Sequence, residues 1–142
     1  MNKKTAIIII FVIVGTVGLA WAFVSLPSDV QNEYIARGAI HWHPEVTVYV
    51  KGEKQELPPN IGIGAVHQPI HTHDDSDQGI VHMEFSSSVR KQDATLGKFF
   101  QNWGQDMRAF GSNMRMTVNG EENAEYGNYV MRDQDKIELW FD

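Results

Sequence analysis

The longest apolar stretch is at the beginning of the chain, where 20 consecutive residues, 5–24, carry no charge. At a rise of about 1.5 Å per residue, a helix of this length spans the roughly 30 Å hydrocarbon core of a bilayer. Lys3 and Lys4 precede the stretch and favour a cytoplasmic N-terminus. We therefore predict a single-pass transmembrane signal anchor over residues 1–24, with membrane lipid as its partner and the remaining chain outside the cytoplasm.

A cleaved signal peptide is the alternative interpretation of this segment, because Ala20 and Ala22 fit the small-x-small cleavage pattern. The apolar stretch exceeds the about 7–15 residues of a usual signal core, and Trp21 and Phe23 suit a membrane interface. These two features favour an uncleaved anchor. Residues 25–38 are polar, with a proline and a glycine, and are predicted to form a stalk.

Hydrophobic and polar residues alternate from residue 38 to residue 50, which is typical of a half-buried β-strand. His41 and His43 have the polar parity, so we expect both imidazoles on the face opposite the core. Residues 51–54 predict a hairpin turn, and residues 60–66 a glycine-bearing loop where backbone can approach a site closely. The apolar positions of the strand are Ile40, Trp42, Val46, Val48 and Val50.

A second histidine-rich segment is predicted to form a β-hairpin around the polar loop 74–79. A loop of this length places His71 opposite His82 in an antiparallel pair, and directly opposed residues share a face of the sheet. His73 and Glu84, each two positions further along its strand, join that face. The expected result is a set of three imidazoles with a carboxylate beside them.

Apolar residues at helical spacing predict a helix over residues 95–107, with Thr95 as its N-cap. An aromatic stripe at this spacing is usually a core face, so we expect Phe100 and Trp103 to pack on a sheet. Further on, Asn119-Gly120 is a strong hairpin signal, followed by strands that end with Ile137, Leu139 and Phe141 directed inward.

Charge and composition exclude several classes of protein. All 18 acidic residues but only 10 of the 12 basic residues lie beyond the predicted anchor, which gives that part a net charge of about −8. This charge disfavours nucleic acid as a partner. The chain contains no cysteine, which excludes disulfides, thiolate metal sites and a lipoprotein anchor.

All six histidines fall between positions 41 and 82, and imidazole is a common ligand of first-row transition metals. A scatter of solvated surface histidines is the alternative interpretation. His67 has no partner at strand spacing, and Asp74 is a candidate acceptor that would orient a ligating imidazole. The predicted metal ligands are His41, His43, His71, His73 and His82.

An all-nitrogen site outside the cytoplasm suits copper or zinc as the bound ion. Methionines near the histidines could add thioether ligands for Cu(I), although packing is their more usual role. Residues 75–79 contain part of a calcium-loop pattern but lack its third acidic position and its final glutamate, so we interpret them as a solvated turn. The methionines concerned are Met83, Met114 and Met116.

Three motifs in the last third of the chain occur in a recognisable order: TLG at residues 95–97, VNG at residues 118–120 and DQDKI at residues 133–137. This order resembles a β-grasp (ubiquitin-like) domain of the sulfur-carrier type. Gln134 replaces the usual glycine, and the sequence ends at Asp142 without the Gly-Gly that a sulfur carrier activates. The resemblance therefore implies a fold and argues against that function.

Taken together, the motifs HWHP, HTHD, GIVHMEF and LGKFFQNWG resemble those of an uncharacterised group of small membrane-anchored prokaryotic proteins. We predict an α+β fold in which an N-terminal transmembrane helix is followed by a β-grasp-like domain at residues 39–142. That domain would have a mixed sheet, one packed helix and a histidine-rich hairpin.

The predicted function is that of a membrane-anchored extracytoplasmic protein that binds copper or zinc for sequestration, delivery or electron transfer. An accessory subunit or assembly factor of a membrane protein complex is one alternative. A cupin-like mononuclear metalloenzyme is another, although the glutamate expected three or four residues after His43 or His73 is absent. No nucleophile–base pair is identified, so we expect a binding protein rather than an enzyme.

Overall fold

The computed structural model describes residues 33–142, and Tyr34–Asp142 form one compact unit. The predicted anchor, residues 1–24, lies outside the described residues, as does most of the predicted stalk. Within the described part, no helix is both long enough and apolar enough to cross a membrane. The domain begins before residue 39, because strand β1 (Tyr34–Ala36) pairs with strand β7 (Val89–Arg90).

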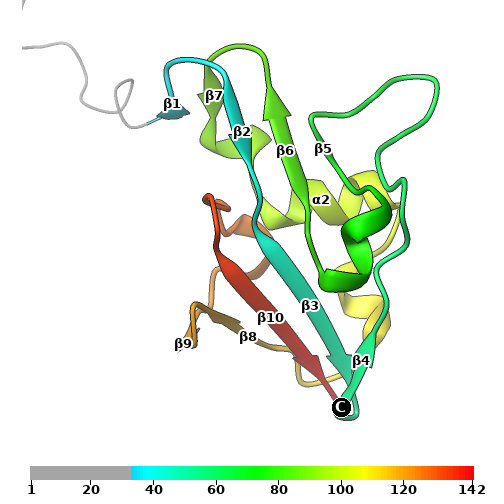
Figure 1. Cartoon of the computed structure of the whole chain (residues 1–142). Coiled ribbons are helices and arrows are strands. Elements are labelled where there is room, and N and C mark those ends of the chain that lie inside the picture. Colours follow the sequence, from blue (N-terminus) through cyan, green and yellow to red (C-terminus); the bar gives the residue numbers. More distant parts are fainter. Residues whose placement is uncertain (1–32) are drawn as a thin grey trace, which may run out of the picture. The chain divides into compact units, whose positions relative to one another are not determined.

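The largest sheet among the described residues has five strands, and its two longest strands run parallel (Figure 1). Strand β10 pairs in parallel with β3 along six residues, from Lys136 opposite Glu45 to Phe141 opposite Val50. The other neighbours are antiparallel. In sheet order the strands are β4 (Glu53–Gln55), β3 (Glu45–Val50), β10 (Lys136–Phe141), β8 (Arg115–Val118) and β9 (Glu121–Glu122).

A second, antiparallel sheet has three strands (Figure 1), and these contain His41, His71 and His82. The predicted hairpin register is confirmed, because His71 lies directly opposite His82. On the other side of the central strand, His41 lies opposite Glu84. In sheet order the strands are β2 (Ile40–Trp42), β6 (His82–Phe85) and β5 (Ile70–His71).

The prediction of one continuous strand over residues 38–50 is wrong. The strand breaks at His43 and Pro44, and its two halves, β2 and β3, belong to different sheets. Proline has no N–H to donate to a ladder and holds φ near −65°, so it interrupts the pairing. The carbonyl of Pro44 instead accepts a hydrogen bond of 2.9 Å from Val81 N, which ties the break to the histidine hairpin.

The single α-helix among the described residues, α2 (Leu96–Trp103), is shorter than predicted. Thr95 is its N-cap as expected, with the side chain accepting a hydrogen bond from Lys98 N. Gly104 ends the helix in the left-handed conformation, at φ 73°, before the apolar spacing runs out. The remaining turns are 3₁₀ helices: η2 (Asp74–Gln78), η3 (Lys91–Asp93), η4 (Met107–Phe110) and η5 (Tyr126–Asn128).

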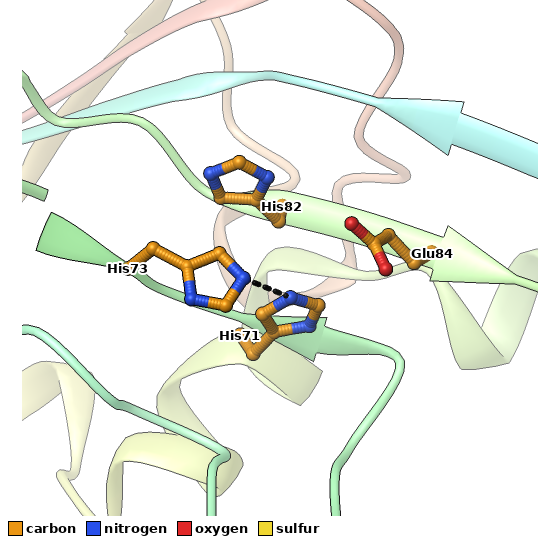
Figure 2. Close-up of side chains that lie close together, drawn as sticks. All are labelled: His71, His73, His82 and Glu84. Carbon is orange, nitrogen blue, oxygen red and sulfur yellow. Dashed lines mark hydrogen bonds between the residues drawn. The ribbon is translucent and has the colours of Figure 1, made fainter. Parts of the chain in front are cut away.

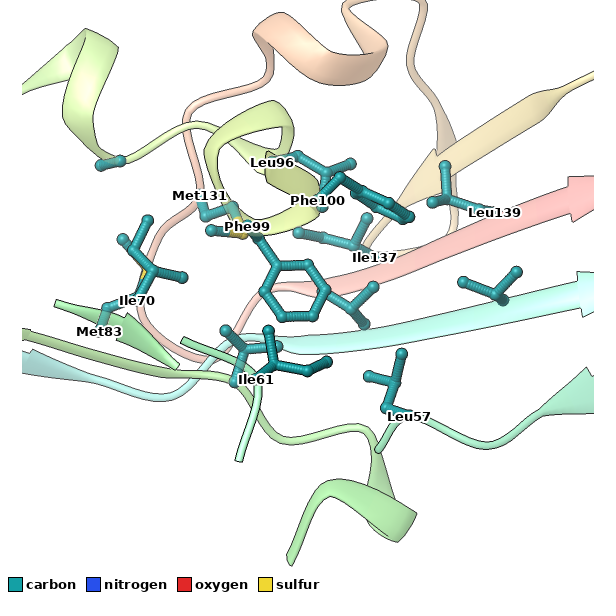
Figure 3. Packing of buried hydrophobic residues seen from close by; sticks show 14 of the residues in the cluster. Leu57, Ile61, Ile70, Met83, Leu96, Phe99, Phe100, Met131, Ile137 and Leu139 are labelled. Atoms are coloured by element: carbon teal, nitrogen blue, oxygen red, sulfur yellow. The ribbon is translucent and has the colours of Figure 1, made fainter. Parts of the chain in front are cut away.

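The core combines apolar side chains of helix α2, of the large sheet and of the three-stranded sheet (Figure 3). Phe99 and Phe100 are buried, as the helical spacing predicts, whereas Trp103 is only partly buried at the edge of the cluster. The residues of the last strand that were predicted to point inward belong to the large sheet and are also buried. The sheet residues of the core include Val46, Val48, Met116, Ile137, Leu139 and Phe141.

The prediction of an α+β fold with a β-grasp-like domain is wrong for the described residues, while the transmembrane helix predicted before that domain lies outside them. Strand makes up 35% of the described domain and helix of all kinds 21%, so it is mainly β with one short helix. The helical content was overestimated because Met107 and Phe110 continue the apolar spacing of α2 but lie in a separate 3₁₀ turn, beyond Gly104.

The turn before β10 is held by Asp135, a buried carboxylate that sequence analysis did not identify. It accepts hydrogen bonds from Tyr129 Oη and Arg132 N, both 2.7 Å long, and from Asn119 Nδ2 at 3.1 Å. The predicted Asn119-Gly120 turn is confirmed as the β8–β9 connection, since both residues have the positive φ angles typical of such hairpins.

Candidate metal centre

The five histidines predicted as metal ligands lie on the strands of the three-stranded sheet or directly after them. Opposed residues share a face, and so do residues two apart in one strand. His41 opposite Glu84, and His71 opposite His82, therefore present their side chains on the same side of the sheet. His43 and His73 follow directly after β2 and β5. Two groups of potential ligand atoms result, and they share His82.

The first group, which we call the inner group, consists of His71, His73, His82 and Glu84 (Figure 2). One ligand atom from each residue lies within 4.8 Å of the others. Within this group, His71 Nε2 and His73 Nε2 are 3.1 Å apart. Three imidazole nitrogens and one carboxylate oxygen make up a donor set that first-row divalent ions accept.

The tautomer of His71 follows from its surroundings. Its Nδ1 lies 3.0 Å from the backbone carbonyl of Gln68, which can only accept a hydrogen bond, so Nδ1 carries the proton. The lone pair is then on Nε2, the atom that faces His73. His71 is only 1% exposed, and this burial is the main cause that lowers its pKa. The neighbouring His67 lowers the pKa of His71 further. His71 is therefore held neutral at pH 7, the form that binds metals.

His82 is oriented in a similar way by Asp75, at the start of η2. The two carboxylate oxygens lie 3.1 and 3.2 Å from His82 Nε2, so this nitrogen is the donor and Nδ1 keeps the lone pair. Nδ1 is buried and, within the described part of the chain, has no hydrogen-bond partner. A buried nitrogen without a partner costs free energy, and a bound metal ion would satisfy it.

The second group, which we call the outer group, consists of His41, His43 and His82. The ring centre of His43 is 4.7 Å from that of His41 and 4.9 Å from that of His82. The side chain of His41 is 62% exposed, and its Nε2 lies 3.1 Å from Glu84 Oε1. The backbone of His43 is fixed at the strand break, where its N–H donates to Asp133 Oδ1 over 2.9 Å.

The backbone around the inner group is tightly packed. Gly62 has φ of 72°, and a Cβ at this position would lie 2.6 Å from the carbonyl oxygen of Ile70 and 3.3 Å from His71 Cβ. The expectation of a close backbone approach in residues 60–66 is therefore confirmed. On the opposite side of the strand, buried Thr72 accepts from Ile61 N and donates to the carbonyl of Pro58, which fixes the segment between His71 and His73.

Of the side chains considered beside the five predicted ligands, only Asp74 differs from its expected place. Asp74, the predicted acceptor for an imidazole, is exposed, and Asp75 takes that place beside His82. His67 lies in neither group, although its ring centre is 4.2 Å from that of His71. Met83 and Met116, considered as thioether ligands, are buried in the hydrophobic core. The contact of Asp75 depends on the 3₁₀ turn, a detail that loop composition does not specify.

Comparisons of the chain with protein-family models, with curated proteins and with solved structures found no match. The resemblance to small membrane-anchored prokaryotic proteins stays a prediction.

Proposed function

We propose that this chain is a membrane-anchored, extracytoplasmic metal-binding protein whose inner group binds a copper or zinc ion. The single observation that carries the proposal is the approach of His71 Nε2 to His73 Nε2 at 3.1 Å, with the proton of His71 held on the opposite ring nitrogen by Gln68. In the metal-free protein His73 Nε2 donates a hydrogen bond to the lone pair of His71 Nε2, and a bound cation would take the place of that proton.

The donor set favours copper or zinc among the available ions. Imidazole nitrogens suit both metals, whereas calcium and magnesium prefer ligand sets made entirely of oxygen. Glu84 supplies one negative charge to the group, and Asp75 a second one behind His82. These carboxylates offset the charge of a divalent ion bound among neutral imidazoles.

Sequestration or delivery of the ion suits this arrangement better than a structural role. The hydrophobic core is made of apolar side chains, none of which belongs to either group of ligands, so the main packing of the described domain does not depend on a metal. The exposed His41 also gives the cluster a solvent-facing side. Electron transfer, which requires copper, remains within the same proposal.

A metalloenzyme is the second candidate, and one observation favours it. A cavity of about 360 Å³ lies beside the inner group, lined in part by His67, His71 and Glu84. An open coordination position facing this cavity would admit a small ligand. Addition of azide to the Co(II)-loaded protein tests this point, since a shift of the visible spectrum indicates an open position and an unchanged spectrum argues against catalysis at the metal.

The test of the metal proposal is a calorimetric titration of Zn(II) and Cu(II) into the full-length chain in detergent at neutral pH. We expect stoichiometric binding by the wild type. Loss of an outer-shell partner of a ligand weakens metal binding by up to about 100-fold. His73→Ala and His71→Gln each remove a ligand itself, so each should weaken binding by at least about that factor. Circular dichroism of each variant checks that it is folded.

His67→Ala is the matched control, because this histidine neighbours His71 without belonging to either group. Its affinity should stay close to that of the wild type. Absence of stoichiometric binding by the wild type would refute the metal proposal. An equal loss of affinity in His67→Ala would refute the assigned ligand set.

A further inference from the structure

His82 is the one residue that belongs to both the inner and the outer group. It lies on the central strand of its sheet, with β2 and the outer histidines on one side and β5 and the inner histidines on the other. Its ring centre is 4.9 Å from that of His43 and 4.7 Å from that of His73. A metal ion in either group would therefore need the same imidazole.

That imidazole has only one lone pair to offer. Asp75 engages Nε2 of His82 through both carboxylate oxygens, so the ring proton stays on Nε2 and Nδ1 alone is free to bind a metal. One nitrogen lone pair forms one coordinate bond. While the contact with Asp75 is maintained, the inner and outer groups cannot both use His82, so only one of them at a time can bind an ion with its full set of ligands.

The two groups differ in their access to solvent. In the outer group the side chain of His41 is 62% exposed, whereas in the inner group His71 is 1% exposed as a residue. Glu84 connects them, because it belongs to the inner group while its Oε1 lies 3.1 Å from His41 Nε2. An ion that arrives from solvent at the exposed His41 meets the outer histidines first, and the carboxylate of Glu84, whose side chain is 45% exposed, connects that side of the cluster with the inner group.

We propose that the cluster binds a single metal ion that enters at His41 and His43 and passes to His71, His73 and Glu84 while His82 remains its ligand. The inference rests on the proposed metal binding and adds the route by which the ion is loaded and released. The transfer exchanges the ligands from His41 and His43 for those of the inner group. The ion keeps its charge, no covalent bond forms, and at least one protein ligand is retained throughout.

The test combines stoichiometry with loading kinetics of the full-length chain, using Zn(II) delivered from a chromophoric chelator. Titration should give one tightly bound zinc per chain despite six histidines. In the double variant His41→Ala/His43→Ala, zinc uptake and zinc release should each slow by about tenfold or more, while the dissociation constant changes little. Both rates fall together because release uses the same route in reverse.

His67→Ala is the kinetic control, since His67 is exposed but belongs to neither group, and its rates should match those of the wild type. Two tightly bound zinc ions per chain would overturn the shared-ligand route. Unchanged rates in the double variant, or a lower affinity with unchanged uptake, would also overturn it. These outcomes all include zinc binding by the wild type, so they differ from the absence of binding that refutes the metal proposal itself.

Discussion

The carboxylate of Asp75 contacts the imidazole of His82 across the histidine hairpin, with Oδ2 3.1 Å and Oδ1 3.2 Å from Nε2. The side chain of His82 is 13% exposed, so this contact sets both the orientation of the ring and the nitrogen that keeps a lone pair. The adjacent Asp74 is exposed and is not placed in this contact. Two neighbouring aspartates thus have different surroundings, and this provides a matched pair of variants.

Asp75→Ala should lower zinc affinity by about 10–100-fold, the usual cost of removing an outer-shell partner of a ligating histidine. Without the carboxylate, the ring of His82 loses its preferred tautomer and orientation. Asp74→Ala removes the same charge from the same turn and should leave the affinity nearly unchanged. Calorimetric titration of both variants measures the difference, and equal losses would show that only the local charge matters.

The metal-free protein should lose stability as the pH falls below about 6.5, the unfolded pKa of a histidine. Burial lowers the pKa of His71 in the folded state, so between the two pKa values the unfolded chain binds a proton that the folded chain does not. The contribution of His71 to the free energy of unfolding is therefore complete above about pH 6.5, and it is lost as the pH falls from there through the pKa that His71 has in the folded state.

Urea unfolding of the chelator-treated protein at about pH 7.5 and about pH 5 measures this effect. In His71→Gln the loss of stability between these two pH values should be smaller than in the wild type, because the group that titrates has been removed. An identical loss in the two proteins would show that other residues dominate the acid response.

Phe99→Ala should lower the free energy of unfolding by about 3–5 kcal/mol, as for other large deletions in a packed core. Phe99 is a residue of α2 and is completely buried in the hydrophobic core. Trp103→Ala should cost less, although the side chain is larger, because Trp103 is only partly buried at the edge of the cluster. Denaturant unfolding of both variants checks the order, and a larger cost for Trp103 would contradict the packing described here.

Stability should also fall above about pH 10, where tyrosines of the unfolded chain lose their protons. Burial and the hydrogen bond to Asp135 raise the pKa of Tyr129 well above its ordinary value. The folded state keeps that proton when the unfolded state has lost it, so rising pH favours unfolding.

Tyr129→Phe should reduce this alkaline loss and, at neutral pH, should cost about 1.5–3 kcal/mol, the range for a hydrogen bond to a charged group. Tyr126→Phe is the control, since the hydroxyl of Tyr126 makes only a 3.5 Å contact with the carbonyl of Met114. Thermal unfolding at neutral and alkaline pH distinguishes the two variants. Equal alkaline losses in the wild type and Tyr129→Phe would remove Tyr129 as the cause.

The register of the histidine hairpin, and which histidines share a face of their strand, could be predicted because both depend on local spacing. Side chains alternate with a period of two along a strand, so the polar parity of His41 and His43 followed from the chain itself. The length of the loop 74–79 likewise placed His71 opposite His82, which the sheet register confirms. Their role as metal ligands stays a prediction.

Residues distant in the sequence decided the rest. The break at Pro44 separates β2 from β3, and pairing of β2 with β6 brings His41 and His43 to His82 from about 40 positions away. The 3₁₀ turn selects Asp75 over Asp74, and the left-handed Gly104 ends α2 before Met107. Local periodicity thus determined which side chains share a face. Only long-range pairing and backbone breaks decided which faces meet, because those contacts join segments whose sequences do not specify one another.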